Sequence, residues 1–303
     1  SVAGLKLLPG HIVDFPNELT NKLKALPSKF KLHCEACERG KLKKSAQTAS
    51  IEREKLTQFG QLVSCDLTGQ LPRSFQDKCT YAVIFVDAFS RHHACYGIQN
   101  KTAVDVGRAI ATYLADTSTY GPVRCIQTDD GKEFVNYAVQ ALLRDRGIKL
   151  SHSAPYSSDT NGRAERGWAC ILPIVRTLLY ESKLGHKHWV ACFQHACRIV
   201  NMTPRPYPHL KHNEEPGKRG GAPMYTPYYL CNKVHPSMGT LMPFGCLAYA
   251  RIPDKLRLGK LDPLSVRGYQ VGLHPDRKGF QIVVPGGGNR YACCRHVRNH
   301  PLR

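Results

Sequence analysis

The chain has 303 residues, with 43 Lys and Arg side chains against 23 Asp and Glu, and a formal net charge of +20 at neutral pH. An excess of this size predicts an anionic partner, of which nucleic acid is the commonest. No run of about 18 apolar residues is present, which argues against a membrane-spanning helix. The 13 cysteines stand mostly singly inside apolar runs. This usage is typical of buried thiols in a reducing compartment and argues against a disulfide framework.

Residues 1–58 are predicted to form a separate N-terminal module. Among the cysteines, only Cys34 and Cys37 have the spacing of a metal-ligand pair, in the sequence Cys-Glu-Ala-Cys. Cysteines two residues apart recur in zinc sites, so this pair is the one feature of the module that suggests a metal.

Residues 59–202 alternate between short apolar runs and longer segments with helical periodicity. Three strands followed by strand–helix alternation predict an α/β fold, a mixed five-stranded sheet with helices on its faces. The strands are expected at 61–68, 81–89, 93–99, 123–128 and 149–154, and the helices at 102–118, 132–148, 161–182 and 188–201.

The chain changes character after residue 202. Residues 203–223 are rich in Pro, Gly and charge, and we expect 203–240 to be a linker with an exposed first half. Residues 241–303 contain short apolar runs between glycine turns, which predict a small basic β-rich domain. Residues 202–303 carry 16 basic and five acidic side chains, so much of the excess positive charge lies here.

Three carboxylates occupy the ends of predicted elements in the middle region. Asp66 lies near the end of the first strand, Asp129 follows the fourth, and Glu165 opens the long helix within "APYSSDTNGRAERGW". An acid in a first helical turn also interacts favourably with the helix dipole, which is the purely structural interpretation of Glu165. If the three converge, they would repel one another without a cation, and hard oxygen ligands suit Mg²⁺ or Mn²⁺.

The spacing and surroundings of these acids resemble a known family. Thirty-five residues separate Asp129 from Glu165. "IQTDDGKEF", "APYSSDTNGRAER" and "FVDAFSRHH" resemble the motifs of retroviral and retrotransposon D,D-35-E integrases. The segment "FGCLAYARIP…KLDPLSVRGYQVGLHPDRKGF" is similar to the part that follows the core in copia-type retrotransposon polyproteins. The resemblance covers roughly residues 5–300.

The resemblance implies a ribonuclease-H-like fold and a metal-dependent DNA strand transfer. In that reaction DNA 3′-hydroxyls attack phosphodiesters of target DNA without a covalent enzyme intermediate. Asp66, Asp129 and Glu165 would bind two Mg²⁺ or Mn²⁺ ions, and Asn161, Arg163 and Arg166 would face DNA. The implied partners are the double-stranded ends of the element cDNA, target DNA and further copies of the chain. The implied localisation is a virus-like particle in the cytoplasm, and the nucleus.

The family also carries an N-terminal His-His-Cys-Cys zinc module, which this chain matches incompletely. His11, Cys34 and Cys37 match three ligands, while Lys6 stands where the other His is expected. His33 is an alternative ligand, although its adjacency to Cys34 makes tetrahedral geometry awkward. We therefore expect a degenerate module that binds zinc weakly.

Several neighbouring features have structural interpretations. Asp87 is expected to be a hairpin residue, Asp130 a turn residue and Glu133 a helix-cap acid. The run "GWACILPIV" departs from the family pattern, and we expect Gly167 and Pro173 to weaken or kink the helix. Two other functions stay open: a degenerate or host-adopted integrase that only binds nucleic acid, and a ribonuclease H that acts on hybrids.

Overall fold

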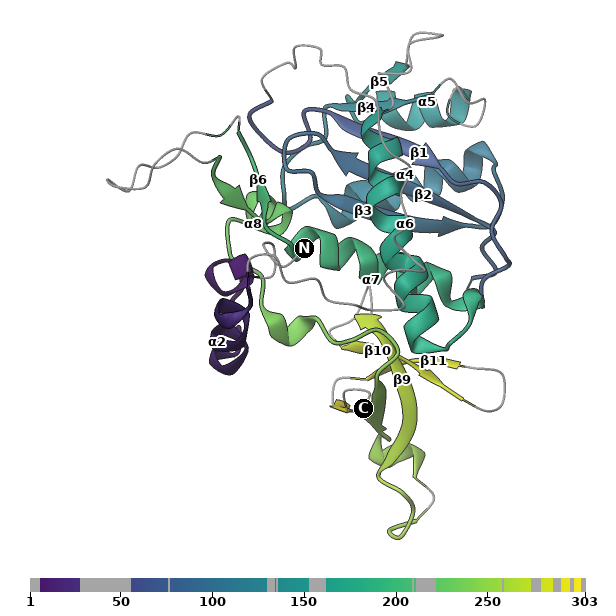
Figure 1. Cartoon of the computed structure of the whole chain (residues 1–303). Coiled ribbons are helices and arrows are strands. Elements are labelled where there is room, and N and C mark those ends of the chain that lie inside the picture. The colour runs from purple at the N-terminus through teal and green to yellow at the C-terminus, as the bar shows by residue number, and fades with distance from the viewer. Residues whose placement is uncertain are drawn as a thin grey trace.

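The structure is a computed structural model. It describes residues 6–27, 56–75, 77–129, 134, 136–152, 162–208, 210, 222–257, 259–273, 279–285, 290–294 and 297–300. Two five-stranded sheets dominate it, and helices α6 and α7 contact both of them (Figure 1).

The central sheet has the strand order β3-β2-β1-β4-β5. Strands β1, β2 and β3 are antiparallel neighbours, whereas β4 and β5 run parallel to β1. Six of the seven residues of β2 are buried, which explains its nearly continuous apolar sequence. The predicted mixed, ribonuclease-H-like sheet is confirmed. Its strands are β1 (Val63–Leu67), β2 (Tyr81–Asp87), β3 (His93–Ile98), β4 (Cys125–Thr128) and β5 (Lys149–His152).

One face of this sheet is covered by α4 (Ala103–Asp116) and α5 (Tyr137–Arg144). Both helices begin at a side-chain cap, because Thr102 accepts a hydrogen bond from the Asp105 amide and Asn136 accepts one from the Ala138 amide. Their apolar faces bury a cluster against β1, β2 and β4. Burial of that face stabilises both helices. Helix α4 lies close to its predicted range, whereas α5 ends at Arg144, four residues before the predicted end at 148.

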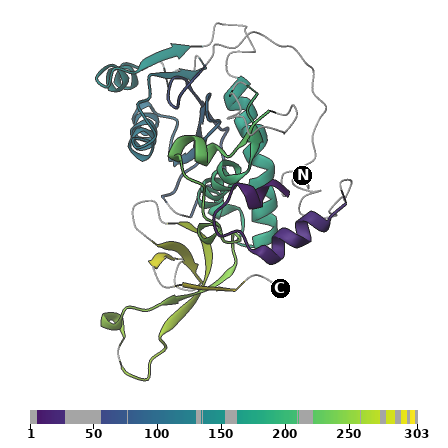
Figure 2. The ribbon, with the colours of Figure 1, turned by 90° about the vertical axis from the view of Figure 1, so that its left-hand side faces the viewer.

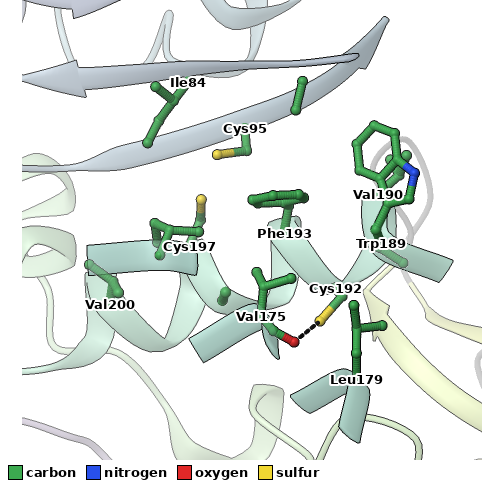
Figure 3. Close-up of a cluster of buried hydrophobic side chains, with 14 of the residues drawn as sticks. Ile84, Cys95, Val175, Leu179, Trp189, Val190, Cys192, Phe193, Cys197 and Val200 are labelled. Carbon is green, nitrogen blue, oxygen red and sulfur yellow. Dashed lines mark hydrogen bonds between the residues drawn. The ribbon is translucent and has the colours of Figure 1, made fainter. Parts of the chain in front are cut away.

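The opposite face is covered by α6 (Gly162–Ser182) and α7 (Trp189–Met202). Figure 3 shows Phe193 and Cys197 of α7 beneath Ile84 and Cys95 of the sheet. The Cys192 thiol donates to the Val175 carbonyl across the two helices, at 3.6 Å. This layer therefore holds α6 firmly against the strands that carry the candidate site.

Helix α6 continues through Gly167 and Pro173, where the sequence "GWACILPIV" predicted a weakened or kinked helix. A Cβ at position 167 would lie 2.7 Å from Cγ2 of Val86 and 3.0 Å from Cδ1 of Ile84. Glycine is therefore needed for α6 to approach β2 this closely, and the loss of helix propensity is offset by packing.

The C-terminal sheet is entirely antiparallel, with the order β11-β10-β9-β8-β12. It has its own small core, and Phe244, Val271 and Val283 also pack into the cluster around α6 and α7. Figures 1 and 2 show this sheet at the opposite end of the molecule from β5. The predicted β-rich unit is thus confirmed, with strands β8 (Leu247–Arg251), β9 (Ser265–Leu273), β10 (Phe280–Val284), β11 (Arg290–Cys294) and β12 (Val297–His300).

The stretch expected to be a linker differs from that expectation where the structure describes it. Tyr207 is fully buried and packs with Phe89 and Leu230, and its hydroxyl donates to the Ser90 carbonyl. Apolar anchors spaced along a polar sequence fasten this segment to the central domain. Its elements are β6 (Arg205–Pro206), β7 (Met224–Tyr225) and α8 (Pro227–Asn232).

The N-terminal segment lies against the chain that follows α8. Val13 pairs with Ser237 in a parallel bridge, in which the Val13 amide donates to the Pro236 carbonyl at 2.7 Å. Helix α2 (Asn17–Ala25) follows this bridge (Figure 2). Single 3-10 turns lie at Leu8–Gly10, His186–His188, Met238–Thr240 and Asp254–Leu256. No helix in the described part of the chain has both the length and the apolar character needed to cross a membrane.

Candidate metal centre

The sheet brings Asp66 and Asp129 to the same edge. Ser64 of β1 is the register partner of Gln127 of the parallel strand β4. Each aspartate lies two residues beyond its partner along neighbouring strands that run in the same direction. Side chains two residues apart share a face, so both carboxylates belong to one face and one end of the sheet.

Glu165 is in the first turn of α6, the helix that packs against this face of β1 and β2. The charges of Asp129 and Glu165 both act on the Asp66 carboxylate. Burial, followed by the charges of Asp129 and Glu165, raises the pKa of Asp66 to about 6, against hydrogen bonds from the Leu67 backbone and Trp168. The side chains of Asp129 and Glu165 are exposed, so the space between the acids opens to solvent.

The chemistry of this donor set suits a divalent cation, because mutually repelling carboxylates are relieved by a hard, doubly charged ion. Beneath them, the Ser64 hydroxyl and the Gln127 carbonyl oxygen are buried without a hydrogen-bond partner in the described structure. Two further side chains with oxygen atoms therefore lie below the carboxylates, on the interior side of the site. Among the described residues, no three His, Cys, Asp or Glu side chains are gathered closely enough to hold one ion together.

Trp168 is a site residue that sequence reasoning missed. Its indole N–H donates to Oδ2 of Asp66 at 3.0 Å. The ring is only 8% exposed and meets Phe193 edge-on, with centroids 5.7 Å apart. The one available signal was its position three residues after Glu165, within the run that departs from the family pattern.

The predicted DNA-facing arginines differ in exposure. Arg166 is exposed, and its guanidinium lies over Gly162, where a Cβ would be 3.3 Å from Nη1. Arg163 is half-buried and already engaged in an interaction. Asn161, Asp130 and Glu133 lie outside the described residues.

Asp87 is confirmed as a hairpin residue. It is fully buried at the end of β2. Its carboxylate accepts hydrogen bonds from the Gly60 amide at 2.8 Å and from the Ser90 amide and hydroxyl, each at 2.7 Å. These three donors account for the carboxylate without any metal.

The predicted zinc ligands lie only partly within the described structure. His11 is half-buried, and burial and the neighbouring His235 lower its pKa. Lys6, at the position of the missing ligand, donates through Nζ to the carbonyls of Lys24 and Leu26 at the end of α2. A cation in this place satisfies the last carbonyls of a helix, so Lys6 has a capping role. Cys34, Cys37 and His33 lie outside the described residues.

A basic and aromatic row crosses the C-terminal sheet. Tyr249 of β8 lies opposite Arg267 of β9 on one side and Arg298 of β12 on the other. Directly opposite residues point to the same face, and all three are exposed, Tyr249 by 38%. In the described structure neither arginine of this row is paired with a carboxylate, so two uncompensated cations flank an aromatic ring.

Comparison with known proteins agrees with this architecture. Residues 57–158 match the Integrase core domain family. Among curated proteins, the chain is 26% identical over 254 residues to the "Retrovirus-related Pol polyprotein from transposon TNT 1-94" of Nicotiana tabacum, covering 83% of this chain and 18% of that protein. The corresponding polyproteins from transposons RE2 and RE1 of Arabidopsis thaliana are 27% and 26% identical, each covering 73% of this chain and 14% of the polyprotein.

A solved structure, the catalytic core domain of BIV integrase, aligns with 57% of this chain and 95% of its own length, at 19% identity and a TM-score of 0.40. The chain spans less than a fifth of the length of the polyproteins. The central sheet and the family match define the class: the chain contains an integrase core domain. The matches to the transposon polyproteins support an integrase region of a copia-type retrotransposon Pol polyprotein, as the sequence motifs indicated.

Proposed function

We propose that this chain is a polynucleotidyl transferase that inserts element cDNA into target DNA by metal-dependent strand transfer. The observation that best supports the proposal is the placement of Asp66 and Asp129 at the ends of neighbouring parallel strands, with Glu165 in the first turn of the helix that packs on the same face. Burial, and then the charges of Asp129 and Glu165, raise the pKa of Asp66. Carboxylates placed at the ends of two strands and in the first turn of a helix would form a rigid ligand set.

The proposed ligands of two Mg²⁺ or Mn²⁺ ions are these three side chains. When bound, such ions activate an attacking 3′-hydroxyl and stabilise the departing 3′ oxygen. The residues of the chain place the reacting groups: the sheet fixes Asp66, and α6 holds Glu165 against it. The exposed Arg166, one residue beyond Glu165, would contact a DNA phosphate beside the carboxylates.

We propose that the C-terminal sheet supplies much of the affinity for double-stranded DNA. Residues 202–303 contain 16 basic and five acidic side chains. Of the acids described, Asp254 already pairs with Arg251 and Arg257, so it does not offset the exposed Arg267 and Arg298. Binding of this kind is dominated by phosphate contacts and tolerates changes of DNA sequence.

Three further proposals complete the function. The chain acts as a homo-oligomer, because two DNA ends must be joined to one target. It works inside a virus-like particle in the cytoplasm and then in the nucleus. The N-terminal module holds zinc weakly through His11, Cys34 and Cys37, since Lys6 supplies no fourth ligand and caps α2 instead.

The alternative function is a degenerate integrase that binds nucleic acid without catalysis. The specific observation in its favour is Lys6, which replaces a family zinc ligand and is engaged elsewhere. Under this alternative the basic C-terminal sheet keeps its role, and the three carboxylates have none.

A strand-transfer assay separates the two functions. The protein is incubated with Mn²⁺, a short blunt duplex as donor and a supercoiled plasmid as target, and joined products are resolved on a gel. We expect products that depend on Mn²⁺ and are absent with Asp66→Asn. Binding to both DNAs with no joining by the parent protein would support the alternative. Cleavage of an RNA–DNA hybrid without joining would point instead to a ribonuclease H.

A further inference from the structure

Trp168 is an unusual neighbour for a candidate metal ligand. Its indole N–H lies 3.0 Å from Oδ2 of Asp66. An indole can donate one hydrogen bond and accept none. Its partner must therefore be an acceptor, such as the carboxylate oxygen of Asp66. An N–H bond to an ionised carboxylate is also stronger than a bond between neutral groups.

The neighbouring sequence builds this contact in two steps. Gly167 allows α6 to approach β2 so closely that a Cβ at this position would lie 2.7 Å from Cγ2 of Val86. Trp168, the next residue, is thereby carried beneath the end of β1, where Phe193 of α7 meets its ring edge-on. The ring is fixed by packing on one side and by its hydrogen bond on the other, so its N–H has little freedom to leave Asp66.

The same helix also carries Glu165, three residues earlier, and residues three apart lie on one side of a helix. A shift of α6 would therefore move Glu165 together with Trp168, the hydrogen-bond donor to Asp66. The indole N–H binds Oδ2 of Asp66, and the Leu67 backbone also donates to this carboxylate. An ionised carboxylate can accept about four hydrogen bonds, so lone pairs remain for a further ligand.

We propose that Trp168 is a positioning residue: it anchors Oδ2 of Asp66 and so holds this carboxylate in the orientation that a divalent cation requires. The proposal rests on the function proposed above, since it assigns Trp168 to the same site. Hydrogen-bond partners of metal ligands orient them, and losing such a partner typically costs roughly 10–100-fold in metal affinity or activity.

The chain provides a matched control. It has two tryptophans, and Trp189 is also buried. Trp189 also meets Phe193 edge-on at 5.7 Å, but its N–H donates to the Pro72 carbonyl at 2.7 Å. Trp168→Phe and Trp189→Phe therefore remove the same group from the same aromatic cluster, and only the first removes it from Asp66.

Mn²⁺ binding to the full chain tests the proposal by calorimetry. We expect Trp168→Phe to weaken binding by roughly tenfold or more, and Trp189→Phe to leave it within about twofold of the parent. Equal affinity for all three proteins would overturn the role of Trp168 while the metal site stands. If the parent binds no Mn²⁺ at all, the proposed function fails, and the positioning role fails with it.

Intrinsic fluorescence gives a second readout that a packing role alone would not change. In Trp189→Phe the remaining indole is Trp168, so its emission should change as Mn²⁺ binds, with the midpoint found by calorimetry. In Trp168→Phe the emission of Trp189 should not follow the metal. An unresponsive Trp168 in a protein that binds Mn²⁺ would contradict the proposal.

Loss of folding in Trp168→Phe would be seen as a changed circular dichroism spectrum. Benzothienylalanine, in which sulfur replaces the indole N–H, can then be incorporated in the Trp189→Phe background. This residue keeps the shape of the ring, so it should keep the fold. We expect it to show the weakened Mn²⁺ binding, and parent-like affinity would overturn the proposal.

Discussion

The two five-stranded sheets of the molecule differ in where they place their charged side chains. In the central sheet β1, β4 and β5 run parallel, so side chains at their carboxyl ends meet at one edge, and this edge carries Asp66 and Asp129. The C-terminal sheet is antiparallel throughout, and its strands place Tyr249, Arg267 and Arg298 side by side across an exposed face.

The difference follows from the geometry of the strands. A parallel edge concentrates groups at a point, which suits a chemical site. An antiparallel face with one side solvated spreads groups over a surface, which suits a long polyanion. Helices α6 and α7 contact both sheets, so the two are parts of one body with a common core. The substitutions below test whether chemistry and binding are divided between the sheets in this way.

The largest effect is expected at the carboxylates. Asp66→Asn, Asp129→Asn and Glu165→Gln should each reduce strand transfer by more than about 100-fold, because each removes a charge from the proposed ligand set. DNA affinity should stay equal or rise, since a negative charge near the phosphates is lost. Strand-transfer yield and DNA affinity measured on the same preparations test this.

Asp87→Asn is the control for these three variants. Asp87 accepts three hydrogen bonds in the hairpin. In the asparagine variant the side-chain NH₂ would face one of these N–H or O–H donors and leave it unsatisfied. We expect this to lower the free energy of unfolding by about 1–3 kcal/mol. Transfer per folded molecule should be normal. A dead but stable Asp87→Asn, or an active Asp129→Asn, would show that the wrong acids have been assigned.

Acid should unfold the central domain. Burial lowers the pKa of His92 and His195 to about 4 and that of His93 to about 3, with help from the positive charges of Arg205 at His93 and Arg198 at His195. Unfolded histidines titrate near 6.5, so below that pH the unfolded chain binds protons that the folded chain refuses. Stability is therefore present above about pH 6.5 and lost as the pH falls toward 4, by about 1.4 kcal/mol per pH unit for each histidine.

The raised pKa of Asp66 acts in the opposite direction between about pH 4 and 6, since the folded state holds that proton more tightly. Three histidines outweigh this one carboxyl. Urea unfolding followed by tryptophan emission at several pH values measures the slope. Between about pH 4 and 6 the net slope is that of about two groups, three histidines less one carboxyl, so His195→Gln should reduce it by about one half. A urea midpoint that is constant between pH 7 and 5 would contradict the assignment of three neutral, buried histidines.

Sequence patterns predicted most of the central sheet because its strands are short, apolar and separated by turn residues. They also predicted that Asp66 lies near the end of one strand and that Asp129 follows another, which is enough to place them at one sheet edge. They did not predict Trp168, because a contact between residues 66 and 168 depends on how closely α6 approaches β2. Local propensity instead assigned a penalty to Gly167, and packing reverses it.

The anchoring of 203–240 was missed for a similar reason. Its composition is that of a linker, and the single buried side chains Tyr207 and Leu230 form no periodic pattern. Lys6 illustrates the limit at the N-terminal module. A missing ligand was visible in the sequence, but its replacement by a cap of α2 depends on contacts with residues 24 and 26.

Two helical glycines separate packing from propensity. Gly167→Ala should destabilise the protein by about 1–3 kcal/mol, because its Cβ would collide with Val86 and Ile84. Gly107→Ala in α4 should stabilise it by up to about 1 kcal/mol, because its Cβ would meet Leu142 at 3.9 Å, an ordinary contact. Thermal unfolding of both variants measures the difference, and equal signs would show that α6 is free to move away from β2.

The smallest effect is expected in the C-terminal sheet, where many cations share the binding. Arg267→Ala with Arg298→Ala should lower DNA affinity by about tenfold at moderate salt, because two phosphate contacts are lost. The slope of log affinity against log salt should become shallower by about 1.8, at about 0.9 per contact. Strand transfer at saturating DNA should be unchanged, since the carboxylate edge is intact.

Arg251→Ala is the control, because Arg251 already pairs with Asp254 and should contribute less. An unchanged salt slope in the double variant would show that this face does not contact DNA. Normal affinity with lost transfer would show that the two sheets do not divide binding and chemistry between them.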